Sequence, residues 1–196
     1  MVAAGAALAD EVGFDCLTMG LLAERVGVRT PSLYKHVGSQ QDLNRRIAAL
    51  ALNEAADAVG GAVHGHAGRD ALTAAARAFR AFVLAHPGRY AATIGMEPFG
   101  PDDPPATAEQ RLLGAFTAVL RGYPLPESDV DHALRMLRSL WHGFATLQAD
   151  DGFRWSADID ESFEWLITFA DRGLRAMSGG RSADGSRVAG RGFSPR

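Results

Sequence analysis

The feature that most constrains the fold is a helical spacing of apolar residues, which recurs in one segment after another. Between Leu72 and Val83 the apolar side chains fall three or four positions apart, so a helix over 69–86 would have one apolar face. The same spacing recurs in three later segments, 112–122, 128–150 and 160–177. No alternating run is long enough to predict a β-strand. The sequence therefore predicts an all-α protein of about nine helices.

Residues typical of helix ends divide the first part of the chain into shorter helices. Gly13 is a candidate C-terminal cap, while Thr18, Thr30 before Pro31, and Ser39 before Asp42 are candidate N-caps. Farther along, Ser128 is a candidate N-cap of a long helix. The helices expected before the first glycine-rich stretch span 3–12, 19–26, 31–37 and 40–59.

Glycine content and a change of composition predict the domain boundaries. The segment 60–68 holds four glycines and is interpreted as a hinge between two domains. The DNA-binding domain spans 1–46 and the effector-binding and dimerisation domain spans 47–177, and the helix that begins at 40 and this hinge link them. Trp165 and Phe169 lie off the apolar stripe of the last helix, so we expect a second copy of the chain to cover them. Residues 178–196 are rich in Gly, Ser and Arg and are expected to form a disordered basic tail.

Composition excludes several classes of protein. A lone cysteine, Cys16, rules out a disulfide framework within the chain. No run reaches the roughly 18–20 apolar residues of a membrane span, and the first residues lack a basic region, so we expect neither a membrane span nor a signal peptide, and a cytoplasmic location. The net charge of −3 argues against a protein that coats nucleic acid.

Basic side chains are nonetheless concentrated in one short segment. All five basic residues of the first sixty fall between 25 and 46, where Asp42 is the single acid. The spacing of Ala23, Gly27, Val28 and Leu33 is that of a helix-turn-helix, with a small residue at the helix contact, a glycine in the turn, and Val28 and Leu33 filling the space between the helices.

Residues 13–43 resemble the DNA-binding domain of TetR-family transcriptional repressors, and the resemblance extends over roughly 2–50. The matching features are Gly13, Thr18, Leu22, Ala23, Gly27, Val28, the run Leu33-Tyr34-Lys35-His36-Val37, Ser39 and Leu43. More loosely, 86–90 and the triplet Trp141-His142-Gly143 resemble the ligand domain of the subgroup named for Trp-His-Gly. The resemblance implies a homodimer that places its third helices in successive major grooves of a palindromic operator. It also implies a small-molecule effector, bound in the C-terminal domain, that changes the distance between the two DNA-reading helices of the dimer.

The residue types of the motif suit DNA contact. Arg29, Thr30 and Ser32 are candidates for base edges, and Pro31 for a thymine methyl group. Candidates for phosphate contact are Thr18, Tyr34, Lys35, His36 and the helix N-terminus capped by Ser39. Arg25, Arg45 and Arg46 are interpreted as ordinary surface charges.

Aromatic and other large apolar side chains of the C-terminal domain are candidates for an effector cavity. They are Phe79, Phe82, Tyr90, Met96, Phe99, Phe116, Leu137, Trp141 and Phe144. His142 is interpreted as structural, and Gly143 as a site of close helix approach. We expect an apolar or aromatic effector, no cofactor and no metal.

Two other functions remain open from the residues. One is an enzyme using a metal or acid-base chemistry built on the histidines, although His64 and His66 lack the helical spacing of a metal site. The other is a TetR-like dimer that binds a small molecule and has lost DNA binding. Family members usually carry a basic arm before the first helix, whereas Met1 already lies within it here, so we expect either a truncated start or weaker DNA binding. Gly20 and Val37 also depart from residues common in the family.

Overall fold

The computed structural model describes residues 1–96, 100 and 102–179 of the 196-residue chain. Over these residues the chain forms nine α-helices and one 3-10 helix, η1, without a β-strand, which confirms the all-α class. The helices are α1 (Val2–Val12), η1 (Phe14–Cys16), α2 (Met19–Arg25), α3 (Thr30–Leu33), α4 (Gln40–Val63), α5 (Gly68–Ala85), α6 (Pro87–Ala91), α7 (Pro104–Leu120), α8 (Glu127–Ala149) and α9 (Ile159–Gly179). The predicted tail lies outside the described residues from position 180 onward. None of the described helices combines the length and the apolar character needed to cross a membrane.

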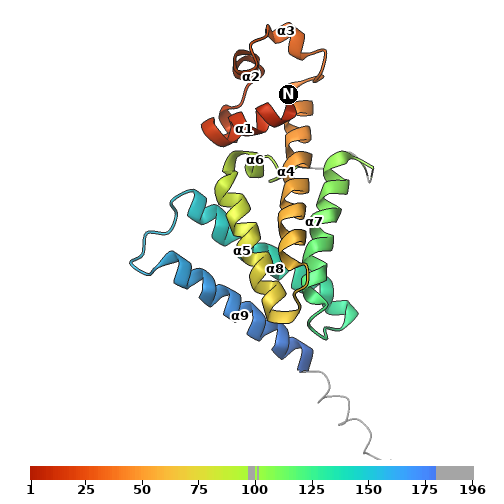
Figure 1. Cartoon of the computed structure of the whole chain (residues 1–196), viewed down its shortest axis with the longest axis vertical. Helices are drawn as coiled ribbons and strands as arrows, with labels where there is room; N and C mark the ends of the chain where they lie inside the picture. The colour runs from red at the N-terminus through yellow and green to blue at the C-terminus, as the bar shows by residue number, and fades with distance from the viewer. Residues whose placement is uncertain (97–99, 101, 180–196) are drawn as a thin grey trace, which may run out of the picture.

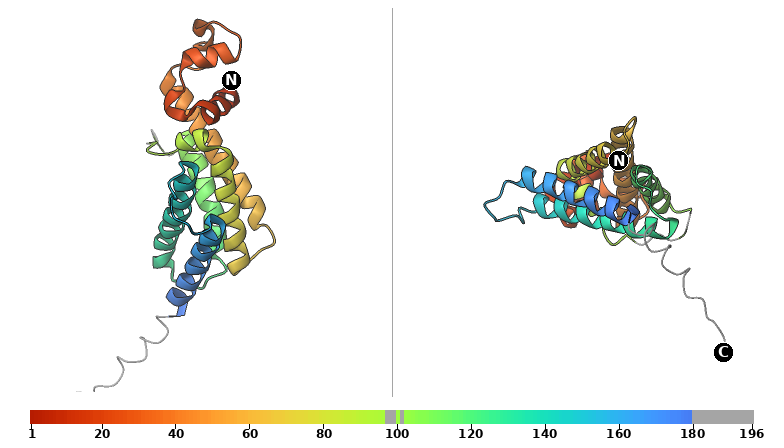
Figure 2. Two further views of the ribbon diagram at one scale, coloured as in Figure 1. Left: turned by 90° about the vertical axis from the view of Figure 1, so that its left-hand side faces the viewer. Right: turned by 90° about the horizontal axis from the view of Figure 1, so that it is seen from below.

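The buried apolar residues form two clusters, one at each end of α4. The first joins α1, α2, α3 and the beginning of α4, with Leu22, Leu33 and Leu43 wholly buried. The second joins the rest of α4 to α5, α7, α8 and α9 around Phe116 and Trp141. We call residues 1–46 the head and residues 47–179 the body. Figures 1 and 2 show the head seated on one end of the body, with α4 running from one into the other.

The hinge expected over 60–68 is wrong for its first two glycines. Helix α4 continues through Gly60 and Gly61 to Val63, and only the turn 64–67 separates it from α5. Glycine in a helix costs roughly 1 kcal/mol relative to alanine. Here Val59 is buried in the body core on the turn before the glycines, and the helix continues against that core. The turn therefore lies inside the body, and head and body are joined by continuous helix.

Several of the expected helix ends are present, and others are shifted. The Thr18 hydroxyl accepts a hydrogen bond from the Leu21 N–H at 3.2 Å, and the Ser39 hydroxyl accepts one from the Asp42 N–H at 3.0 Å. Thr30 is not a cap, because the extended residue before α3 is Arg29 and Thr30 already lies in the helix. Ser128 likewise lies inside α8, which begins after Pro126.

Candidate nucleic-acid interface and effector cavity

The helix-turn-helix is formed by α2, a tight turn and α3. Gly27 adopts a φ of +71°, a conformation that costs little only for glycine, and the following Val28 N–H donates to the Ala23 carbonyl at 3.0 Å. Leu33 is wholly buried between the helices, as expected. Val28 is 43% exposed, so its predicted packing role is wrong, because the turn directs its side chain away from the core. Helix α3 also ends at Leu33, and 34–36 form a turn rather than further helix.

The residues predicted to contact DNA lie on the outer end of the head. Eight of the nine are exposed and Thr30 is half-buried. Figure 1 places α3, which they flank, at the extreme end of the molecule, far from α9. Tyr34 shows 52% of its surface although its neighbours Leu33 and Val37 are buried. The nine residues are Thr18, Arg29, Thr30, Pro31, Ser32, Tyr34, Lys35, His36 and Ser39.

Three arginines of the basic segment bind acidic residues of the same chain. Arg25 makes a two-pronged hydrogen bond to the Glu11 carboxylate and so ties α2 to α1. Arg46 donates to Asp42 at 2.9 Å and to the His36 carbonyl at 3.2 Å, which fixes the end of the turn after α3 against α4. The first contact thus joins α2 to α1, and the second joins the turn after α3 to α4.

The third, Arg45, is a buried residue, so its interpretation as a surface charge is wrong. It forms an ion pair with Asp103, the residue just before α7, and both side chains are nearly excluded from solvent. A charge that leaves water needs such a partner. Sequence reasoning missed this link between head and body because the two residues are 58 positions apart.

The start of α4 is less open to phosphate than the sequence implies. The Asp42 carboxylate accepts a hydrogen bond from the Gly38 N–H at 2.9 Å, beside the Ser39 cap. The Arg46 hydrogen bond, followed by that of Gly38, lowers the pKa of Asp42, so the carboxylate is charged at neutral pH. This negative charge beside the helix N-terminus opposes a phosphate there and leaves the other candidates as the stronger ones.

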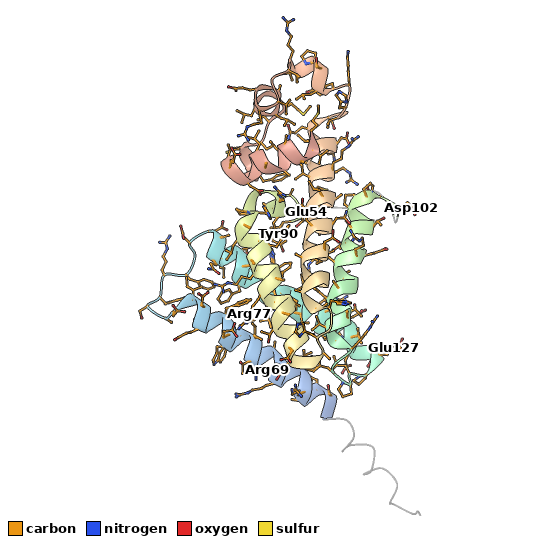
Figure 3. All side chains as sticks on the ribbon, in the orientation of Figure 1. Glu54, Arg69, Arg77, Tyr90, Asp102 and Glu127 are labelled. Atoms are coloured by element: carbon orange, nitrogen blue, oxygen red, sulfur yellow. The ribbon has the colours of Figure 1, made fainter. Side chains whose placement is uncertain are left out.

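A second link between head and body runs through α6. The Arg89 side chain donates to Asp10 of α1 at 2.8 Å and to Glu54 of α4 at 2.7 Å. Its backbone N–H also donates to Asp10. A Cβ on Gly88 would lie 1.9 Å from the Ala9 carbonyl oxygen, so the backbones of α6 and α1 are in direct contact. Figure 3 labels Glu54 and Tyr90 at this junction.

The predicted effector residues do not line one cavity. Phe79, Tyr90 and Phe116 line a cavity of about 20 Å³ between α4, α5, α6, α7 and α8, which is room for about one water molecule. Phe82, Leu137 and Trp141 are buried in the body core, and Phe144 is buried beside Phe153. Met96 packs against the head cluster instead. Phe99 lies outside the described residues.

Sequence reasoning also missed the charged residues of this cavity. Glu109 of α7 and Arg138 of α8 line it and pair with each other at 2.8 Å. Arg138 lies one helical turn before Trp141 on an amphipathic helix that carries other charged residues, so the sequence held no distinct signal for it. Leu52, Thr93, Leu112 and Leu113 complete the lining.

Tyr90 and His142 form a polar pair beside the cavity. The Tyr90 hydroxyl lies 2.8 Å from Nδ1 of His142. Burial raises the pKa of Tyr90 to about 12, against the opposing charge of Arg138. Burial, and after it the charge of Arg138, lowers the pKa of His142. At neutral pH both groups are therefore uncharged.

The metal-site alternative depends on ligand-type side chains lying close together. Within residues 1–96, 100 and 102–179, no three His, Cys, Asp or Glu side chains are grouped so as to hold a metal ion. His64 and His66 lie in the turn between α4 and α5 and are exposed to solvent.

The family of the chain follows from comparison with known proteins. Residues 1–47 match the family described as bacterial regulatory proteins, tetR family, and residues 72–170 match the one described as Tetracyclin repressor-like, C-terminal domain. The chain belongs to the TetR family. It is therefore a helix-turn-helix transcriptional regulator by family. The resemblance to the Trp-His-Gly subgroup stays a prediction.

Individual TetR-family relatives cover most of the chain. An uncharacterized HTH-type transcriptional regulator of Mycobacterium tuberculosis, Rv0681, is 34% identical over 89% of this chain and 80% of the relative. A possible TetR-family regulator of Streptomyces coelicolor has a similar structure, with a TM-score of 0.70 at 24% identity over 89% of this chain and 97% of the other. A TetR variant of Acinetobacter baumannii in complex with minocycline has a TM-score of 0.66 at 23% identity over 91% of this chain and 96% of the other.

Proposed function

We propose that this TetR-family protein is an effector-responsive repressor that binds a palindromic operator as a homodimer. The observation that carries the proposal is the exposed set of hydrogen-bonding and basic side chains around α3, at the far end of the head. Arg29 has the forked donors that suit guanine, while Tyr34 and Lys35 suit phosphate oxygens. Each head would enter one major groove, with the two half-sites about 34 Å apart.

A gel-shift assay with the DNA that flanks the gene tests the DNA-binding part. We expect the full chain to shift this DNA, and the double variant Arg29→Ala, Tyr34→Ala to lose most of the affinity. Arg121→Ala is the matched control, because Arg121 is exposed at the end of α7 that lies away from the head. Absence of a shift for the wild-type chain would favour the alternative of a TetR-like protein without DNA binding.

The homodimer is supported by an apolar face on α8 and α9. On α9, Trp165 and Phe169 are 70% and 55% exposed and stack on each other with ring centroids 5.7 Å apart. The same face continues to Met177 and, on α8, to Met136 and Leu147. An exposed apolar surface of this extent is typical of a protein interface. We assign it to a second copy, as in the dimeric family to which the chain belongs.

Two glycines within this face support close packing of helices. A Cβ built on Gly143 of α8 or on Gly173 of α9 would meet no described atom within 4 Å. Neither glycine is therefore required by packing within the subunit. Both positions would let the partner's helices approach the backbone closely, which agrees with the role expected of Gly143.

Sedimentation analysis tests the dimer. We expect the wild-type chain to sediment as a dimer, and Phe169→Glu to sediment as a monomer, because a charge would be buried without a partner. Ile94→Glu is the control, since Ile94 is 55% exposed but lies after α6, away from α9. A monomeric wild-type chain would contradict the proposal.

For the response to effector, we propose that α6 carries the signal. Tyr90 lines the cavity, and the preceding residue Arg89 binds Asp10 in the head. An effector that binds the protein more tightly when α6 is in one position shifts the population of molecules toward that position. The shift in free energy is no larger than the difference between the effector's binding free energies for the two positions. This route runs through α6 and α4 and does not involve the glycine-rich segment 60–68. The minocycline complex of the Acinetobacter relative supports a small-molecule effector without indicating which one.

A further inference from the structure

The cavity among Phe79, Tyr90 and Phe116 has an aromatic interior and a charged opening. The three aromatic side chains are at most 7% exposed. Arg138 and Glu109 lie at the opening, with side chains 54% and 38% exposed. A ligand entering here would meet the ion pair before it reaches the aromatic rings.

A second, larger pocket lies next to the cavity and shares one lining residue with it. A pocket of about 160 Å³ between α5, α6 and α8 is lined by Tyr90, His142 and Thr146. Tyr90 lines both spaces, so its side chain is the wall between them. If this ring shifted, the cavity, which has room for about one water molecule, would join the larger pocket. The joined space would be large enough for a small aromatic molecule.

The charged groups available to a ligand at the opening of the cavity are the guanidinium of Arg138 and the carboxylate of Glu109. Arg138 offers a guanidinium whose planar fork matches a carboxylate. Trp141 does not line the cavity; it is fully buried behind Phe116 and packs edge-to-face on it at 5.0 Å between centroids. No acceptor among the described residues lies within hydrogen-bonding distance of its Nε1. The exposed guanidinium at the opening can bind the carboxylate of a ligand in place of that of Glu109.

The charge of Arg138 also reaches the wall of the cavity. The positive charge of Arg138 lowers the pKa of Tyr90, against the effect of burial, and lowers the pKa of His142. The charge of Arg138 therefore acts on residues of both α6 and α8. Glu109 contributes to neither shift. The field at this wall is therefore positive, which again suits an anion.

We infer that the effector is an aromatic carboxylic acid, whose carboxylate replaces Glu109 as the partner of Arg138 and whose ring packs among Phe79, Tyr90 and Phe116. The inference rests on the proposed effector-dependent function and names the chemical class of the effector. Exchange of one carboxylate for another at Arg138 conserves the ion pair, so the guanidinium is never left without a partner. The ring gains burial against three aromatic side chains.

Calorimetric titration of the full chain with three matched probes tests the class of ligand. The probes are 2-naphthoate, its uncharged amide 2-naphthamide, and the cation 2-naphthylmethylamine, with benzoate as a smaller acid. We expect the acid to bind about tenfold or more tightly than the amide, the difference of a charge-assisted hydrogen bond. The inference is overturned if amide or amine binds as tightly as the acid, or if neither acid binds at millimolar concentration.

Two variants of the ion pair should have opposite effects on the acid. Arg138→Gln is expected to weaken binding about ten- to a hundredfold, because the charged partner is lost. Glu109→Gln is expected to tighten it about two- to fivefold, because a competing carboxylate is removed from an exposed pair. Arg135→Gln, on the exposed side of the same helix, should change nothing. A purely structural ion pair would make both variants weaken binding, and a cationic effector would reverse the two signs.

The ligand titrations are made without DNA, so their failure is distinct from failure of the proposed function. If the wild-type chain shifts DNA but binds neither acid, the inference about the ligand class is overturned and the proposed DNA-binding function stands. A chain that binds the acids with the two expected signs but shifts no DNA overturns the proposed function and supports the ligand class.

Discussion

At the scale of single residues, burial rather than residue type decides the role of each charge. Arg29 and Arg45 belong to the same basic segment, but the first is exposed at the outer end of the head and the second is paired with Asp103 inside the protein. The sequence places both within twenty positions of each other and cannot separate them. The same holds for His142, whose half-buried position next to Tyr90 lowers its pKa and so affects stability.

Stability should therefore fall in mild acid because of His142. The pKa of His142 is lowered in the folded state. Its contribution to the free energy of unfolding is therefore fully present above its pKa in the unfolded chain, about 6.5, and is lost as the pH falls through its pKa in the folded protein. We expect denaturant unfolding between about pH 7 and pH 5 to show a smaller loss of stability in His142→Gln than in the wild type. His66→Gln, an exposed histidine, should leave the pH dependence unchanged. An unaltered slope in His142→Gln would contradict the assignment.

At the scale of elements, the five-residue helix α6 makes three separate contacts in three successive residues. Gly88 touches the backbone of α1, Arg89 binds Asp10 and Glu54, and Tyr90 lines the cavity. Pro87 starts the helix with its φ already set for it. A helix this short has little stability of its own, so its position depends on these contacts. This makes α6 suited to move when one of them changes.

Replacing Gly88 by alanine should separate α6 from α1. The added methyl group would overlap the Ala9 carbonyl, so backbone must shift, and such overpacking costs about 1–3 kcal/mol. For a chain of this size we expect the melting temperature to fall by about 2–10 °C, measured by circular dichroism. DNA affinity should fall as well, because the head loses its support.

Gly114→Ala provides the matched control for this substitution. Gly114 lies inside α7, and a Cβ there meets no described atom within 4 Å. Alanine should be neutral or stabilise the helix by up to about 1 kcal/mol. Equal melting temperatures for the Gly88 and Gly114 variants would show that the close contact between α6 and α1 is unimportant.

At the scale of the whole molecule, the surfaces that we propose for DNA reading and for self-association lie at opposite ends. Figure 1 shows the head at one end, and α9 along the side of the body farthest from it. Helix α4 spans the two parts without a break, and the Arg45–Asp103 pair adds a second connection. In a dimer joined through α8 and α9, a small rotation of each subunit would therefore be enlarged at the two reading helices.

The salt dependence of DNA binding should report the number of phosphate groups that this dimer neutralises. Lys35 is exposed and lies beside Tyr34, where we predict a phosphate contact. Removal of one such cation from a phosphate changes the slope of log affinity against log salt by about 0.9. Lys35→Ala should thus lower the slope by about 1.8 for a dimer, measured by fluorescence anisotropy at several salt concentrations. A change of only about 0.9 would indicate that one head alone binds, and an unchanged slope that Lys35 does not touch phosphate.

Most helices, the helix-turn-helix and the exposed side chains around α3 could be predicted from the sequence, because these depend on spacing and capping within a few residues of chain. Gly60 and Gly61 show where such local reasoning fails, since contact with the body core maintains a helix that their own preference would end. Local reasoning also fails, for a related reason, at Val28, at Arg45 and at the pair of Arg138 with Glu109. Their surroundings are set by the packing of the folded chain, because burial and ion pairing join residues that are far apart in the sequence.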